Sequence, residues 1–362
     1  MARVAVPQYL LYPEQDFSKA APGHKFYLYP AVWQQDWSAI SGGKVKALQK
    51  ICGLSADGDD KARAQALVDR QRSLVDSLQA QPKRGIWQLP AKSTAPFATG
   101  LGMEHPLENG FAFLTPYGLP YLPGSGIKGV VRAAAFELAK RKFADLDPAG
   151  WDDPAIDALF GRVEDSKKDS GGRQGALRFW DAYPQPPLRG ELLQVEIMTP
   201  HQSHYYAGEQ PPHDSGSPNP IPFLAIAPGV GFNFIVECNL PLLRRSAPEL
   251  AQDERWQGLL RAAFEHAFAW LGFGAKTAVG YGAMEADQGE LERLESVAEQ
   301  RAKQIKRERE LAEIDDPLLR RLEQLLDERP DKGQPEHVFL IQLLEKGSFQ
   351  GEEARVADPD GL

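Results

Sequence analysis

Two segments of this chain place cationic side chains among glycines, a combination that suits the binding of phosphate groups. The downstream segment covers residues 272–282, and its candidate binding residues are Gly272, Gly274, Lys276, Thr277, Gly280, Tyr281 and Gly282. Four glycines in eleven residues indicate a backbone that turns tightly or lets a ligand approach closely. With Lys276 and Thr277 between the glycines, phosphate is the expected ligand. The simpler alternative is a helix C-cap followed by a bend, with Tyr281 filling the core instead of stacking on a base.

The upstream segment, Pro123–Arg132, is predicted to be the start of a helix. Ser125 is expected to cap that helix, while Lys128 and Arg132 lie four residues apart on one face. Two cations in the first turns repel each other and oppose the helix dipole. An anion bound between these cations and the free amides would offset this cost. A tight turn with solvated cations is the alternative. If both segments bind one ligand, that ligand is a polyanion.

Nucleotide cofactors are not expected. The glycines at 124, 126 and 129 match the spacing of a dinucleotide-binding loop, but the residues before them, Pro120–Pro123, are unsuited to a central strand. The acidic residues at the expected distance, Asp145 and Asp147, follow a predicted helix and not the required second strand, and neither segment contains the Gly-Lys-Ser/Thr of a P-loop. We therefore predict no cofactor.

A polar insertion at residues 199–220 carries the remaining candidates. Its histidines, His201, His204 and His213, could bind a metal together with Asp214, although a loop of this composition does not fix their geometry. Tyr205 and Tyr206 are suited to stacking on bases or to contacting another protein. His204 and Tyr206 could also serve as acid and base in a metal-independent ribonuclease, with Lys276 stabilising charge.

Composition is that of a globular protein, with 42% hydrophobic and 25% charged residues among 362. The only cysteines are Cys52 and Cys238, and no apolar run suits a signal peptide or a membrane span. We therefore expect a soluble, cytoplasmic protein. The net charge of −9 argues against a free-standing nucleic-acid binder, but residues 288–362 contain 19 acidic and 12 basic residues, so the rest of the chain is nearly neutral.

The hydrophobic pattern predicts an α+β fold. Strands are expected at 111–114, 175–180, 193–198, 232–238 and 279–284, and helices at 126–143 and 255–271. This order corresponds to a ferredoxin-like (RRM-like) βαββαβ core with a polar hairpin insertion. A further helix is expected at 61–79, and charged helices at 290–314 and after Pro317. We divide the chain into an N-terminal extension (1–95), the core (96–286) and a helical C-terminal extension (287–362).

Four ordered motifs resemble the RAMP superfamily of CRISPR proteins. They are Gly100–Gly110, Leu119–Gly129, Phe179–Ala182 and Gly272–Gly282, and Pro218–Leu224 narrows the resemblance to one subunit type of the type III-B effector complex. The resemblance covers about residues 99–284. The Gly-x-Gly loop by itself marks only the superfamily, whereas the ordered set is far more specific. The N-terminal zone and the acidic tail depart from a minimal member.

The resemblance implies a non-catalytic RNA-binding backbone subunit that holds the guide RNA toward its 3′ end. Its partners would be the guide RNA, the target RNA and neighbouring RAMP subunits. No binding to a membrane is expected. Phosphates would bind at Ser125, Lys128, Arg132 and Lys276, and the insertion, with His204, Tyr205 and Tyr206, would form a thumb that wedges into the guide–target duplex. The family places target cleavage in a neighbouring subunit, so no catalytic residue is assigned. A guide-processing ribonuclease and a pure assembly subunit are the alternatives.

Overall fold

The computed structural model describes residues 3–7, 17–38, 43–52, 59–140, 150–162, 172–187, 190–200, 205, 207–208, 211 and 218–345. The chain divides into two compact units, Met1–Gln288 and Gly289–Leu362. Within the described residues, no helix is both long enough and apolar enough to span a bilayer. The fold combines helices and sheet, which agrees with the predicted α+β class.

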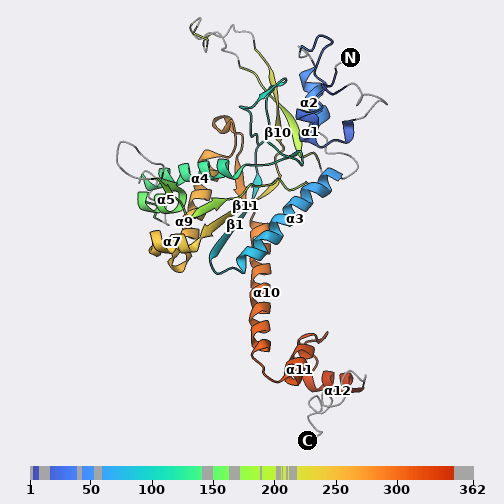
Figure 1. Cartoon of the computed structure of the whole chain (residues 1–362), viewed down its shortest axis with the longest axis vertical. Helices are drawn as coiled ribbons and strands as arrows, with labels where there is room; N and C mark the ends of the chain where they lie inside the picture. Colours follow the sequence, from blue (N-terminus) through green and yellow to red (C-terminus); the bar gives the residue numbers. More distant parts are fainter. Residues whose placement is uncertain are drawn as a thin grey trace. The chain divides into compact units, whose positions relative to one another are not determined.

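A four-stranded sheet forms the centre of the first unit (Figure 1). Its strands lie in the order β12 (Met284–Ala286), β1 (Arg84–Ser93), β11 (Gly231–Asn239) and β8 (Leu177–Phe179). All neighbours are antiparallel. Since β1 and β8 are both antiparallel to β11, they run in the same direction. The registers align Gly85 of β1 and Leu177 of β8 with the same residue of β11, Cys238.

Helices α4 (Gly124–Ala139) and α9 (Arg255–His266) pack on one face of this sheet. Phe234 of β11 is fully buried there, with its ring 5.2 Å from Phe264 of α9, and Trp87 of β1 lies 5.1 Å from the same ring. The Nε2 atom of His266 lies 2.7 Å from a carboxylate oxygen of Glu137, which joins the two helices. Alternate side chains of a strand point to opposite faces, and the other face carries the polar pairs Gln88–Asn233 and Arg84–Glu237 together with the buried Ile235.

Helix α3 (Asp59–Gln79) contacts β1 on the first unit's opposite side, and Figure 1 shows it across the strands from α4 and α9. Before it come α1 (Pro22–Tyr27) and α2 (Lys44–Cys52). The other described α-helices and strands of this unit are β2 (Glu104–His105), β3 (Glu108–Asn109), β4 (Phe113–Leu114), β5 (Leu119–Pro120), α5 (Asp153–Phe160), β6 (Gly161–Arg162), β7 (Arg173–Gln174), β9 (Leu193–Met198), β10 (Ile221–Ile226), α7 (Leu240–Ser246) and α8 (Pro248–Ala251).

The strand assignment from sequence needs three corrections. The first strand of the sheet is β1, within the segment assigned to the N-terminal extension, whereas the predicted strand at 111–114 is the short β4 of another sheet. Pro90 and Gly85 inside β1 weakened its strand signal. The predicted strand at 193–198 pairs with β10 in a separate sheet. The closing strand begins only at Met284, because Thr277–Val279 forms a 3₁₀ turn.

The described part of the second unit is helical. Its elements are α10 (which begins at Gln288 and ends at Ala312), α11 (Pro317–Asp327) and α12 (Glu336–Glu345). The guanidinium of Arg307 on α10 bonds Asp327 through Nε at 2.6 Å and also pairs with Glu323, so one cation ties α10 to α11. Leu291 of α10 and Leu340 of α12 are buried, 9% and 8% exposed.

We expect Phe234→Ala to destabilise the first unit by about 3–5 kcal/mol, because it removes a buried ring that packs against Phe264 and Phe273. Urea denaturation followed by circular dichroism measures this loss. Leu28→Ala is the control, since Leu28 is 53% exposed and its truncation is expected to cost less than about 1 kcal/mol. Equal losses for both variants would contradict the assignment of Phe234 to the core.

Candidate nucleic-acid interface

The glycine loop, residues 272–282, follows α9 through a π-helical turn at Ala267–Leu271. Backbone bonds tie it to the segment after β1: Gly282 N donates to Pro96 O at 2.8 Å, and Ala275 N donates to Ala98 O at 2.7 Å. A third bond, from Phe273 N to Gly282 O at 2.9 Å, closes the loop on itself. The loop is therefore anchored to the end of β1.

Two of its glycines are required by close backbone packing. A Cβ atom at Gly282 would lie 1.8 Å from Phe273 O, and one at Gly274 would lie 2.3 Å from Ala98 O. Gly272 and Gly280 also have positive φ, but the space around a Cβ atom at Gly280 is open. Packing thus explains Gly274 and Gly282 without a ligand, whereas Gly280 lies exposed at the surface with backbone accessible to a partner.

Lys276 has a left-handed backbone, with φ of 60°, a conformation that costs an L-residue about 1–2 kcal/mol. Its half-buried side chain lies over the β9–β10 sheet, with Nζ 3.1 Å from the sulfur of Met198 and 5.4 Å from the centre of the Phe223 ring. Thr277 beside it opens the 3₁₀ turn, and its carbonyl accepts a bond from Gly280 N at 3.0 Å. Strained non-glycine residues are concentrated at functional sites.

Tyr281 makes a second contact between the loop and β9. Its hydroxyl donates to Glu196 Oε2 at 2.9 Å, and its ring lies 5.6 Å from that of Phe223. Burial, followed by the hydrogen bond to Glu196 and its negative charge, raises the pKa of Tyr281 to about 12. The phenol is therefore neutral at physiological pH and acts as a donor.

The start of α4 is capped differently from the prediction. Helix α4 begins at Gly124 with Pro123 as its N-cap, and no side chain makes the usual capping bond. Ser125 lies exposed in the first turn, so its predicted role as the cap is wrong. Asp181, which is distant in the sequence, binds a free amide of the first turn instead: its Oδ1 accepts a hydrogen bond from Gly124 N at 2.7 Å. This carboxylate takes up one of the amides that an incoming anion would use.

The two cations of α4 lie in different surroundings. Arg132 turns toward Gly161, where its guanidinium donates to the carbonyl at 3.3 Å and lies 5.4 Å from the centre of the Phe136 ring. Lys128 is half-buried, and neither a hydrogen bond nor an ion pair links it to another described residue. Burial and the nearby charge of Arg132 lower the pKa of Lys128. A partly desolvated amine of this kind gains from binding an anion.

The sheet topology places both predicted segments at the same end of the first unit. The glycine loop is bonded to Pro96 and Ala98, directly after β1, and α4 begins beside Asp181, directly after β8. Since β1 and β8 run in the same direction, both segments follow the carboxyl end of a strand, although β8 ends level with Trp87 in the first half of β1, because Phe179 and Trp87 both pair with Val236. We call this end of the sheet, with residues 124–132 and 272–282, the glycine-rich end.

Most of the polar insertion falls outside the described residues, including His201, His204, His213, Asp214 and Tyr206. Tyr205 is described and is 49% exposed. The strands that flank the insertion, β9 and β10, form an antiparallel pair from Leu193↔Ile226 to Met198↔Ile221. In the described part of the chain, no three His, Cys, Asp or Glu side chains form a group that could hold a metal.

One residue that sequence reasoning missed is Trp270, which is 66% exposed in the π-helical turn before the loop. π-Helical turns occur frequently at functional sites. No signal in the sequence marked it out, because Trp270 lies within the segment 255–271 that was predicted to be a helix with a buried apolar face. An exposed indole here provides a surface for stacking or for a protein contact.

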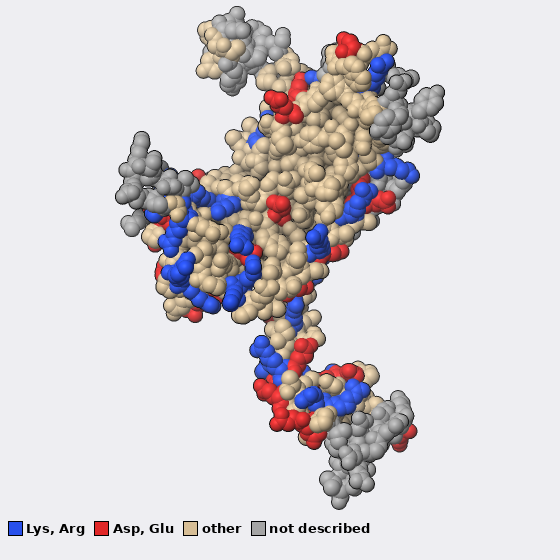
Figure 2. Space-filling model, viewed as in Figure 1, with Lys and Arg blue, Asp and Glu red and all other residues tan. Residues whose placement is uncertain are grey.

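Lys and Arg side chains gather over the region of α4, α5, α7 and α9 on the face shown in Figure 2. Exposed members in this region are Arg162, Arg244, Arg245 and Arg261. Arg162 has an acidic partner, Asp157, at 3.4 Å. The nearly neutral body therefore carries a locally cationic face, as binding to a phosphate backbone requires.

The chain belongs to the RAMP superfamily, whose family model matches residues 91–285. It is similar to the CRISPR system Cmr subunit Cmr6 of Pyrococcus furiosus, with 28% identity over 53% of this chain and 65% of that protein. The Cmr6 subunit of Saccharolobus solfataricus is 29% identical over 36% of both chains. The chain thus spans less than two thirds of the length of these relatives. The resemblance predicted from the sequence is confirmed.

Two solved structures are also similar to this chain. A chain in the cryo-EM structure of the type III-B Cmr-beta complex bound to cognate target RNA has 21% identity and a TM-score of 0.43, over 68% of this chain and 71% of that one. The crystal structure of Cmr6 from Pyrococcus furiosus has 26% identity and a TM-score of 0.31, over 56% of this chain and 98% of that one.

Gly282→Ala is expected to destabilise the first unit by about 3 kcal/mol, because the added Cβ adds a backbone clash to the strain of a positive φ. Gly280→Ala is the matched control. It has a positive φ but open space, so only about 1–2 kcal/mol is expected. Urea denaturation compares the two, and a larger loss at Gly280 would contradict the packing role of Gly282.

The stability contributed by Tyr281 is expected to depend on pH above 10. Because its folded-state pKa lies above the ordinary 10.0, the contribution is complete below about pH 10 and is lost as the pH rises to about 12. Tyr281→Phe should remove this dependence and cost about 1 kcal/mol at pH 7 through the lost bond to Glu196. Denaturation at a series of pH values measures the difference from wild type, and an identical pH dependence in both proteins would contradict the assignment.

Proposed function

We propose that this chain is a non-catalytic, RNA-binding backbone subunit of a type III-B CRISPR effector complex, and that it holds the guide RNA toward its 3′ end. The observation that carries the proposal is the placement of Lys128 and the glycine loop at the same end of the sheet. Membership of the RAMP superfamily and the similarity to Cmr6 subunits support it. Guide RNA, target RNA and neighbouring RAMP subunits are the proposed partners.

We assign the core to the ferredoxin-like class. The order of elements along the chain, β1, α4, β8, β11, α9, β12, is βαββαβ. If β1, β8, β11 and β12 are counted as strands one to four, their order across the sheet is 4-1-3-2. On this assignment β1 belongs to the core, which then begins near residue 84 rather than 96. The preceding residues remain an N-terminal extension, and the helices from α10 onward a C-terminal extension.

RNA phosphates are assigned to the glycine-rich end, where exposed backbone lies near cations. Lys128 supplies a half-buried amine without an ion-pair partner among the described residues, and Gly280 supplies exposed backbone. Lys276 would release its weak contact with the sulfur of Met198 to reach a phosphate, since a charged acceptor bonds an ammonium more strongly than a thioether does. Ser125 and Arg132 would complete the contacts.

The proposed thumb is the insertion between β9 and β10. This strand pair provides a base for it, and the bonds from Lys276 and Tyr281 to β9 connect that base to the glycine loop. RNA held by the loop would therefore lie close to the thumb. Tyr205 is exposed there and suited to stacking on a base, with His204 and Tyr206 as its proposed neighbours.

Replacing Lys128, Arg132 and Lys276 together by Ala is expected to weaken guide RNA retention at least tenfold, because three phosphate contacts are lost. The complex is assembled from all its subunits with labelled guide RNA, and retention is measured by filter binding at several salt concentrations. The triple variant should also reduce the slope of affinity against salt. A matched control replaces the exposed cations Lys46, Lys50 and Lys83 by Ala.

The outcome separates the proposal from its alternatives. Unchanged retention in the triple variant, together with the absence of RNA crosslinks to Lys276 in the wild-type chain, would indicate a pure assembly subunit. Specific cleavage of repeat RNA by the purified chain in EDTA would indicate a guide-processing ribonuclease. Reduced retention without cleavage is the expected result.

A further inference from the structure

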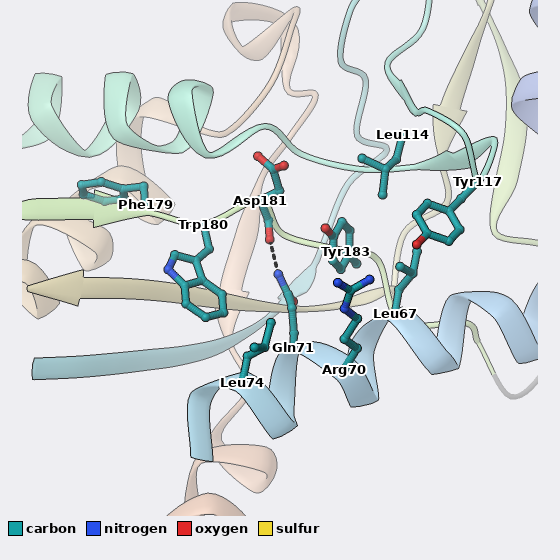
Figure 3. A pocket seen from close by; sticks show the side chains of 10 residues that line it. All are labelled: Leu67, Arg70, Gln71, Leu74, Leu114, Tyr117, Phe179, Trp180, Asp181 and Tyr183. Atoms are coloured by element: carbon teal, nitrogen blue, oxygen red, sulfur yellow. Dashed lines mark hydrogen bonds between the residues drawn. The ribbon is translucent and has the colours of Figure 1, made fainter. Parts of the chain in front are cut away.

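An open hollow of about 470 Å³ lies between α3 and the segment that follows β8 (Figure 3). Its volume is within the range of small-molecule sites. The side chains that matter for its chemistry are Arg70, Gln71, Tyr117, Trp180, Asp181 and Tyr183. None of these residues belongs to the contacts proposed above.

Aromatic rings form the two sides of the hollow. Figure 3 shows Trp180 on one side and Tyr117 and Tyr183 on the other, with Arg70 and Gln71 rising between them from α3. Both tyrosine rings also pack against the small apolar cluster of Ala64, Leu67 and Leu119. The rings are therefore held in place by the fold, as a stacking site requires.

The polar groups of the hollow are partly fixed. Gln71 Nε2 donates to the backbone oxygen of Asp181 at 2.6 Å, which orients the amide, while Gln71 Oε1 has no partner among the described residues. Arg70 is exposed and makes no ion pair with any described residue. Burial, followed by the charge of Asp181, raises the pKa of Tyr183, so its hydroxyl stays protonated at neutral pH.

These groups match the parts of a nucleotide. A planar base suits stacking on the ring of Trp180, since every base presents a π-face. A donor of the base, such as the N3–H of uracil or an exocyclic amine of another base, would find an acceptor in Gln71 Oε1, and a phosphate would find a cation in Arg70. A neutral apolar side chain from a protein partner would use the rings but leave Arg70 without an anion.

The hollow is also coupled to the start of α4. Asp181 accepts the bond from Gln71 through its backbone oxygen and the bond from Gly124 through its carboxylate. Asp181 thus lines the hollow and also contacts the first residue of α4 at the glycine-rich end. RNA passing the α4 start would lie close to the hollow.

We infer that this hollow binds one nucleotide of single-stranded RNA, with the base stacked on Trp180 and the phosphate on Arg70. The inference rests on the RNA-binding role proposed above and adds a site for a base to a surface that otherwise contacts phosphates. It would fix the position of one base of the strand without Watson–Crick pairing.

The test uses the full chain and a 12-nucleotide oligouridylate that carries one 4-thiouridine. We expect ultraviolet crosslinks at Trp180, Tyr117 or Tyr183, mapped by mass spectrometry. Trp180→Ala and Arg70→Ala should each weaken binding about tenfold in fluorescence anisotropy, consistent with the loss of a stacked base or a phosphate contact. Arg72→Ala is the matched control, because Arg72 lies on the same helix but does not line the hollow. Circular dichroism confirms folding, and Arg70→Ala alters only an exposed side chain.

The results distinguish this inference from the proposed function. If Trp180→Ala and Arg70→Ala bind like wild type while the Lys128, Arg132 and Lys276 variant loses RNA, the hollow is not a base site and the proposed function stands. If all of them bind like wild type, both are wrong. Free uridine 5′-monophosphate that binds more tightly than the oligouridylate, and that loses this binding in Trp180→Ala and Arg70→Ala, would assign the hollow to a mononucleotide and overturn the RNA assignment. Loss of partner subunits from the assembled complex with unchanged RNA binding would overturn it in favour of a protein contact.

Discussion

Pairing of β1 on both edges is the constraint on which the first unit depends. β1 bonds with β11 along its whole length, from Arg84↔Asn239 to Lys92↔Gly231, and with β12 at its end. This central position fixes the direction of β8 and therefore the end of the sheet at which α4 begins. The segment after β1 then accepts the backbone bonds of the glycine loop. Without this strand, the two glycine-rich segments would have no common frame.

The glycine loop shows how packing and function share one sequence. Gly274 and Gly282 lie where a Cβ atom would meet a carbonyl oxygen, so the fold alone requires them. Gly280 has open space and remains exposed. Lys276 keeps a left-handed backbone that the anchored ends of the loop impose. A rigid loop with an exposed, cation-bearing turn is suited to hold a phosphate backbone without paying to order itself on binding.

Asp181 connects the two surfaces that we assign to RNA. Its carboxylate holds the first amide of α4, and its carbonyl holds Gln71 in the wall of the hollow. Phosphate contacts position a strand, whereas a stacked base fixes where one nucleotide lies. A subunit that carries both would set the register of the RNA along the complex while leaving its sequence to base pairing.

The sequence by itself determined the α+β class, the helices α3, α4 and α9, the charged C-terminal helices and the family, because helical periodicity and ordered glycine motifs are local signals. It also identified Lys128, Lys276 and the glycines as candidates. Only the tertiary structure decided that β1 is the central strand, that Asp181 instead of Ser125 holds the first amide of α4, and that Lys276 lies on the β9–β10 sheet. It alone revealed the exposed Trp270 and the aromatic hollow. These features arise from residues far apart in the chain, and no local pattern encodes which distant strand or carbonyl will become their neighbour.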